Sequence, residues 1–95
     1  MTNKQKIVEW MENENGSEQG LIFAQKLEQI VKTEYKNCTY EQDFSIQCVD
    51  GLHRVIIDNK YILDIDYYTE LKTIYENGVD NAVEIYFNKI KQMLN

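Results

Sequence analysis

Apolar side chains recur with the 3.6-residue period of an amphipathic helix toward both ends of the chain, and they alternate with polar ones in the middle. The helical pattern predicts four helices, over residues 3–13, about 17–36, about 66–77 and about 79–94. Gly16 and Gly78 are expected to end the helices before them, because glycine readily adopts the left-handed conformation of a helix C-cap. Ser17 and Asp66 are suited to cap the helices that follow.

The apolar faces of these helices are expected to form much of the core. Helix by helix, they hold Ile7, Val8, Trp10 and Met11; Phe23, Ala24, Leu27, Ile30, Val31 and Tyr35; Tyr67, Tyr68, Leu71, Ile74 and Tyr75; and Val79, Ala82, Val83, Tyr86, Phe87, Ile90, Met93 and Leu94. Ile22 and Ile85 point away from these faces. Glu34 falls inside one of them, so its stem is expected to follow the edge of the core while its carboxylate reaches water.

Three β-strands are predicted in the middle of the chain, from the segments FSIQCV, LHRVII and YILDI. Asp50 and Gly51 between the first two strands are typical of a two-residue hairpin turn. A three-residue loop over 58–60 is expected to join the second strand to the third. This order of elements predicts an α+β fold in one domain, residues 1–95, with two N-terminal helices, a three-stranded antiparallel meander and two C-terminal helices.

Alternation along the strands sets their expected register. The turn at Asp50-Gly51 places Cys48 opposite His53 on the core face, and therefore Phe44 opposite Ile57. On the second hairpin, the three-residue loop keeps Tyr61, Leu63 and Ile65 with the core. It also puts Val55 opposite Leu63, and Arg54 opposite Asp64 on the outer face. That outer face is expected to hold Ser45, Gln47, Val49, Leu52, Arg54, Ile56, Ile62, Asp64 and Asp66. Because this face is partly apolar, either a helix pair covers it or another protein does, a second copy of the chain included.

The charge of the chain limits the classes of partner. It has 10 Lys and Arg against 16 Asp and Glu, for a formal net charge of −6. This charge disfavours direct binding to nucleic acid or to an anionic membrane, and it favours a basic protein partner. No apolar run approaches the ~20 residues needed to span a bilayer. The N-terminal segment lacks the apolar middle of a signal peptide, so a cytoplasmic location is expected.

The residues that most often carry chemistry form no recognised motif. Cys38, Cys48 and His53 are the only soft metal ligands, and they lack zinc-binding spacing, so no metal or other cofactor is expected. In a reducing cytosol the two cysteines are expected to be free thiols. Cys48 and His53 could form a nucleophilic pair, yet no third group orients them and a strand centre is poorly accessible to substrate. We therefore expect a protein that is not an enzyme. The alternative is a small-molecule-binding or enzymatic domain that uses Cys48 and His53, with a pocket formed between subunits.

Carboxylates gather where the third strand meets the third helix. Asp64, Asp66 and Glu70 follow one another there. Asp66 is interpreted as the N-cap, and Glu70 as a solvated acid in the first helical turn, where the helix dipole favours negative charge. The corner from Asp64 to Glu70 also carries Tyr67 and Tyr68, which makes it the first place to look for a partner.

In size, acidity, tyrosine content and absence of motifs, the chain resembles small inhibitor proteins encoded by phages and mobile elements, the anti-CRISPR proteins among them. The resemblance covers the whole chain through composition and no segment through a motif. It implies a non-catalytic inhibitor in the host cytoplasm that binds the basic nucleic-acid site of a nuclease effector, with carboxylates in the place of phosphates. The candidate contact residues are Asp64, Asp66, Tyr67, Tyr68, Glu70, Asp80, Glu84 and Ile85.

Overall fold

The computed structural model describes residues 2–13, 16–44 and 51–94, and the elements below are those of this part of the chain. In chain order they are α1 (Asn3–Asn13), α2 (Gly16–Glu34), β1 (Tyr40–Phe44), β2 (Leu52–Ile57), β3 (Lys60–Asp66), α3 (Tyr67–Asn77) and α4 (Val79–Leu94). The strands form one antiparallel sheet in the order β1-β2-β3. The predicted α+β fold and its order of elements are confirmed.

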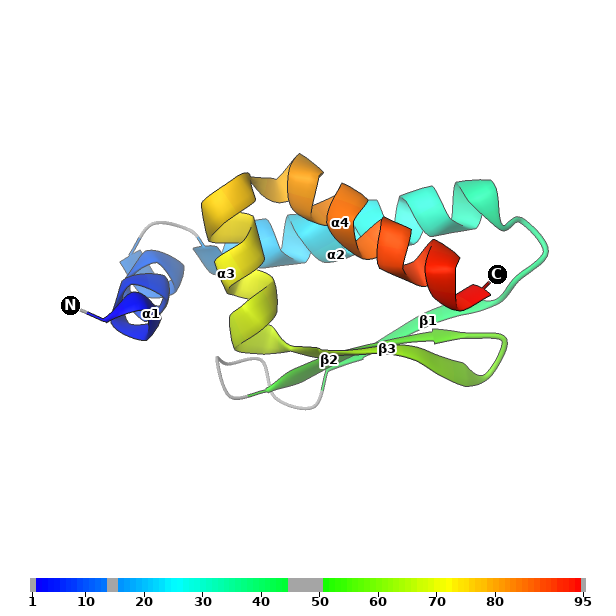
Figure 1. The fold of residues 1–95 in the computed structure, drawn as a ribbon, viewed down its shortest axis with the longest axis horizontal. Coiled ribbons are helices and arrows are strands. Elements are labelled where there is room, and N and C mark those ends of the chain that lie inside the picture. The colour runs from blue at the N-terminus through cyan, green and yellow to red at the C-terminus, as the bar shows by residue number, and fades with distance from the viewer. Residues whose placement is uncertain (1, 14–15, 45–50, 95) are drawn as a thin grey trace.

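The helices all lie on one side of the sheet (Figure 1). Helices α2 and α4 run above the strands, α3 descends to the end of β3, and α1 packs beside α2 and α3 at one end of the molecule. Side chains on β2 alternate accordingly, because those facing the helices are buried and those facing away are half-buried. The fold is therefore two layers, with the core between the helices and the inner face of the sheet.

The core contains most of the predicted apolar faces. Its fully buried large side chains include Ile7, Phe23, Leu27, Val31, Val55, Ile57, Leu71, Ile74 and Ile90. Ile22 and Ile85 are exposed, as predicted. Two residues of the predicted apolar helix faces are exposed. Met93 is 60% exposed in the last turn of α4, and Tyr75 is 46% exposed at the end of α3, where its ring meets Trp10 edge to face.

Two of the three predicted caps for which geometry is given are correct. Asp66 caps α3 by accepting a hydrogen bond from the Thr69 backbone N–H at 3.2 Å. Gly78 stops the same helix with φ of 84° and donates its N–H to the Ile74 carbonyl. The third, a left-handed Gly16 at the end of α1, is wrong, because Gly16 is the first residue of α2 and its φ is not positive. A Cβ there would lie 2.6 Å from Trp10 Cε3, so glycine lets α2 approach α1 closely.

The predicted register of the first hairpin is wrong. Strand β1 covers Tyr40–Phe44, and Phe44 lies opposite His53, where Cys48 was expected. Tyr40, Gln42 and Phe44 point inward, while the acids between them point out. Polar contacts made by Gln42, described below, stabilise this arrangement. Cys48 and most of the predicted first strand lie outside the described residues.

The second hairpin reaches the predicted outer pair by another route. Asp58 and Asn59 have φ of 52° and 64°, which makes the connection a two-residue turn of the type that matches strand twist, and not the expected three-residue loop. An irregularity in β3 then restores the alternation, so that Arg54 faces Asp64 as predicted. Because of this irregularity, Tyr61 lies opposite Ile56 and is 67% exposed, although it was expected in the core. Ile62, expected on the outer face, packs against the core.

Candidate functional site

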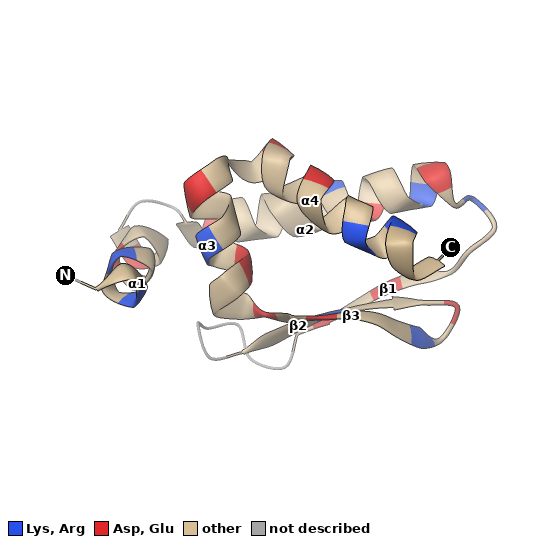
Figure 2. Cartoon of the chain, in the orientation of Figure 1, with Lys and Arg blue, Asp and Glu red and all other residues tan. Residues whose placement is uncertain are grey.

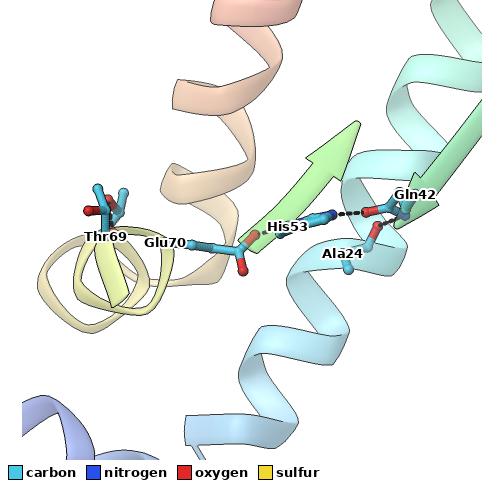
Figure 3. Close-up of polar contacts among 6 residues, drawn as sticks. Ala24, Gln42, His53, Thr69 and Glu70 are labelled. Carbon is cyan, nitrogen blue, oxygen red and sulfur yellow. Dashed lines mark hydrogen bonds and ion pairs between the residues drawn. The ribbon is translucent and has the colours of Figure 1, made fainter. Parts of the chain in front are cut away.

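A chain of buried polar groups runs through the middle of the molecule (Figure 3). His53 on β2 and Glu70 on α3 are 0% and 1% exposed, and they are the buried polar or charged side chains of the described residues. His53 Nδ1 lies 2.5 Å from Glu70 Oε1, and His53 Nε2 lies 2.6 Å from Gln42 Oε1. Gln42 in turn donates through Nε2 to the Ala24 carbonyl at 3.2 Å. These hydrogen bonds thus link α3, β2, β1 and α2.

The far end of this chain fixes the direction of its hydrogen bonds. A carbonyl oxygen can only accept, so the Gln42 amide must turn its NH₂ group to Ala24 and its oxygen to His53. His53 Nε2 therefore carries a hydrogen and donates it to Gln42. The other ring nitrogen, Nδ1, faces a carboxyl oxygen of Glu70.

Aromatic rings enclose the imidazole and keep it from solvent. Phe44 stacks on it with centroids 4.3 Å apart, and Phe23 meets it edge to face at 6.5 Å. Burial in this setting raises the pKa of the Glu70 carboxyl, while the hydrogen bond and the charge of His53 act in the opposite direction. Glu70 Oε2 has no hydrogen-bond partner among the described residues.

The inward position predicted for His53 is confirmed, and the solvated position predicted for Glu70 is wrong. His53 points inward, as predicted, and both of its ring nitrogens are hydrogen-bonded. Glu70 is in the first turn of α3, yet it is buried and not solvated. Glu70 lies on the same helical face as Tyr67, Leu71 and Ile74, and this spacing is the sequence signal that could have found it. A histidine that faces the core and an acid on the apolar face of a helix are candidates for a buried hydrogen bond with each other.

The outer face of the sheet carries a different group of side chains. Its central row is Asp43 on β1, Arg54 on β2 and Asp64 on β3. Arg54 Nε lies 3.5 Å from Asp64 Oδ1, and Arg54 Nη1 lies 3.8 Å from Asp43 Oδ2. The predicted Arg54–Asp64 pair is therefore confirmed, whereas Asp43 was missed because β1 was expected four residues later.

Rows of half-buried or exposed side chains flank this central row. Glu41, Ile56 and Tyr61 oppose one another on one side, and Leu52 opposes Asp66 on the other. The Arg54 guanidinium lies 6.0 Å from the centre of the Tyr61 ring. We call these eight described residues the outer sheet face: Glu41, Asp43, Leu52, Arg54, Ile56, Tyr61, Asp64 and Asp66. With four carboxylates and one guanidinium, this face has a net negative charge.

The structure separates the predicted contact residues into distinct places. Asp64 and Asp66 lie on the outer sheet face, and the acidic positions of β1 and β3 can be followed in Figure 2. Tyr67 and Glu70 are buried, and Tyr68 is half-buried. The remaining three, Asp80, Glu84 and Ile85, are exposed on the first half of α4, in the helical layer, where Asp80 pairs with Lys26 at 2.7 Å. The burial of Tyr67 and Glu70 leaves them little or no surface for contact with a partner in this conformation. Contact by the other six stays a prediction.

Two hollows near the buried chain are small. One of about 200 Å³ is lined by residues that include Phe44 and Tyr67, and one of about 230 Å³ by residues that include Asp64 and Asp66. Neither is lined by His53 or Glu70, and both are smaller than the ~300–1,000 Å³ typical of ligand pockets. Within the described ranges, no three Cys, His, Asp or Glu residues are grouped so as to hold a metal ion. Cys38 is a free thiol. Of the four described helices, none combines the length and apolar character needed to cross a bilayer.

Comparison with known proteins leaves the chain's own geometry as the basis for functional inference. No protein-family model matches it, and neither a curated protein nor a solved structure matches it.

Proposed function

We propose that this chain is a non-catalytic protein-binding module whose outer sheet face docks on a basic surface of a nucleic-acid-binding protein. One observation carries the proposal: the helices of the described chain all lie on the other side of the sheet, so this acidic and partly apolar face has no cover (Figure 1). Antiparallel sheets often leave one face to water, and the apolar side chains on this face make it available to a partner as well.

The arrangement of charge on the face suits a partner that otherwise binds phosphates. Glu41 and Asp43 form one line along β1, and Asp64 and Asp66 form another along β3. Within each line the Cα atoms are about 7 Å apart, and the two lines are about 10 Å apart, as strand geometry requires. Two parallel rows of carboxylates offer a counterpart at fixed backbone spacing to lysine and arginine side chains.

Apolar side chains beside these lines provide the contact area that charge alone does not. Ile56 and Leu52 are half-buried and Tyr61 is 67% exposed, all on the outer sheet face. Aromatic side chains with a polar tip are common anchors in protein interfaces. An isologous dimer through the same face is less favourable, because it would bring four carboxylates of each copy together.

The alternative function, a small-molecule-binding or enzymatic domain built on Cys48 and His53, finds no support in this geometry. His53 is 0% exposed, and both of its ring nitrogens are engaged within the core. Phe44, and not Cys48, lies opposite it. A substrate therefore has no route to the imidazole in this conformation.

Charge reversal on the outer sheet face tests the proposal. The double variant Asp43→Lys/Asp64→Lys reverses charge on both lines, and Glu84→Lys makes the same kind of change on α4 as a matched control. Each chain is immobilised and exposed to bacterial lysate, and retained proteins are identified by mass spectrometry. We expect the unaltered chain and E84K to retain a basic protein that elutes with added salt or with a DNA or RNA oligonucleotide, and the double variant to lose it.

Two results would overturn the proposal. One is retention of the same proteins by the double variant, with unfolding midpoints showing that it is folded. The other is a retained protein that oligonucleotide cannot displace. Loss of retention in E84K alone would move the binding surface to α4, where Asp80, Glu84 and Ile85 were predicted to act.

A further inference from the structure

The hydrogen bonds of the buried chain determine how many protons it holds. Gln42 requires a hydrogen on His53 Nε2. The 2.5 Å contact between His53 Nδ1 and Glu70 Oε1 requires one more, because an imidazole lone pair and a carboxylate oxygen would repel each other at this distance. We infer that His53 and Glu70 form a buried proton-binding site, which holds one proton between Nδ1 and Oε1 and couples that proton to the docking of α3 on the sheet.

Net charge explains why one proton is the stable number. With the proton on nitrogen, the pair is imidazolium and carboxylate; with the proton on oxygen, both groups are neutral. Both forms have zero net charge, which a site with exposed fractions of 0% and 1% tolerates. A second proton would leave an unpaired positive charge in the core, and loss of the only proton would leave an unpaired negative one. Both of those states are costly in a nonpolar interior.

The groups around the pair favour retention of its proton. Glu70 acts electrostatically on Tyr40 of β1, Tyr67 of α3 and Tyr86 of α4, and burial raises the pKa of all three phenols. These rings therefore stay neutral near pH 7. The other carboxylates that act on the tyrosines, Glu28 of α2 and Asp66 at the start of α3, are negative. The charges in this group of residues are negative and so oppose the formation of a further negative charge.

The proton connects elements that meet only through the tertiary fold. Glu70 belongs to α3, His53 to β2, Gln42 to β1 and Ala24 to α2 (Figure 3). Loss of the proton breaks the hydrogen bond by which Glu70 joins α3 to this polar network. Helix α3 begins at the N-cap Asp66, which is also part of the outer sheet face. The proton site and the proposed docking surface therefore share one junction, between β3 and α3.

The effect of pH on folding follows from the proton count. In an unfolded chain a glutamate loses its proton near pH 4.3 and a histidine near pH 6.5. Above about pH 6.5 unfolding therefore releases the one proton of the pair, and the unfolding equilibrium constant should rise about tenfold per pH unit. The raised pKa of the buried Glu70 carboxyl changes stability with pH in the same direction. Stability that depends on a proton retained in the folded state is lost as the pH rises through the pKa of the folded state.

The substitution Glu70→Gln separates the shared proton from the shape of the site. A glutamine NH₂ group can donate to Nδ1 of a neutral imidazole, which keeps the hydrogen bonds without a titrating proton. Urea unfolding is measured from pH 5 to 9 for both proteins. Above about pH 6.5 we expect the unfolding constant of the unaltered chain to rise by up to about tenfold per unit as the pH rises, and that of E70Q to stay level. Below about pH 6.5 the unfolding constant of the unaltered chain should stay level, while that of E70Q rises as the pH falls, because E70Q destabilises imidazolium in the core. Other titrating groups, such as the cysteines, cancel in this comparison.

The single histidine of the chain provides a second readout that needs no variant. With ¹⁵N-labelled histidine, the NMR spectrum of the folded protein should show a hydrogen on Nε2 and a hydrogen bond between Nδ1 and the Glu70 carboxyl. A folded protein whose Nε2 carries no hydrogen, or whose Nδ1 shares no proton with Glu70, would overturn the inference. Equal pH slopes for the unaltered chain and E70Q would overturn it as well. Both readouts are independent of any partner, so they can fail while the docking proposal stands.

Discussion

Truncation of Glu70 to alanine should show how much stability the buried polar chain provides. The change leaves His53 Nδ1 without a hydrogen-bond partner in the core, which costs about 1–3 kcal/mol. It also removes a buried methylene, worth about 0.8 kcal/mol, and opens a cavity. The substitution removes a carboxyl whose Oε2 has no partner among the described residues, and this offsets part of the cost. The free energy of unfolding should therefore fall by about 2–4 kcal/mol.

This loss is a large share of the ~5–15 kcal/mol expected for a small domain. It should appear as a decrease in melting temperature of roughly 10–30 °C in a circular-dichroism melt. Glu76→Ala is the matched control, because Glu76 is exposed on the same helix and its truncation should change stability by less than about 0.5 kcal/mol. If E70A and E76A melt within about 2 °C of each other, the carboxyl does not hold α3 to the sheet, and the account of the buried chain is wrong.

Two further predictions concern the ends of helices. Gly16→Ala should destabilise the protein by about 1–3 kcal/mol, because its Cβ would lie 2.6 Å from a Trp10 ring atom, whereas Gly20→Ala, with its nearest contact at 3.1 Å, should cost less. Urea unfolding of both variants checks this, and equal midpoints would contradict it. Asp66→Ala should cost about 1 kcal/mol through loss of the α3 N-cap, while Asp64→Ala on the same face should cost less because its ion pair is exposed. Thermal melts at high salt give the cleanest comparison, and a larger loss in D64A would refute the assignment of the cap.

The helices could be predicted from the sequence because their information is local. Helices α1 and α4 begin and end at the expected residues, and Gly78 ends α3 as its chemistry suggests. The Arg54–Asp64 pair was also predictable, although the predicted turn had the wrong length. The apolar residues at the end of β3 must face the core, and this requirement sets the same register at Arg54. In each of these cases a short stretch of chain carries the whole signal.

The buried chain and the position of β1 were not predictable in this way. Both depend on contacts between residues that are distant in sequence, such as Gln42 with Ala24 and His53 with Glu70. The segment after Phe44 has the better apolar alternation, so a local criterion selects it over the more polar YEQDF of β1. Glu70 was misplaced for a related reason, because an acid in a first helical turn usually faces water.

The contacts of Gln42 also determine which of several pairings β1 adopts. A slip of β1 by two residues along β2 would keep its inward side chains facing the helices, so hydrophobic burial alone distinguishes such registers poorly. The slip would, however, bring Tyr40 or Phe44 to the place of the Gln42 amide. His53 Nε2–H would then lose its acceptor, with the cost of an unpaired polar group in the core. The polar residues in the interior thus select one alignment of the sheet among near-equivalent ones, a selection that the apolar residues around them do not provide.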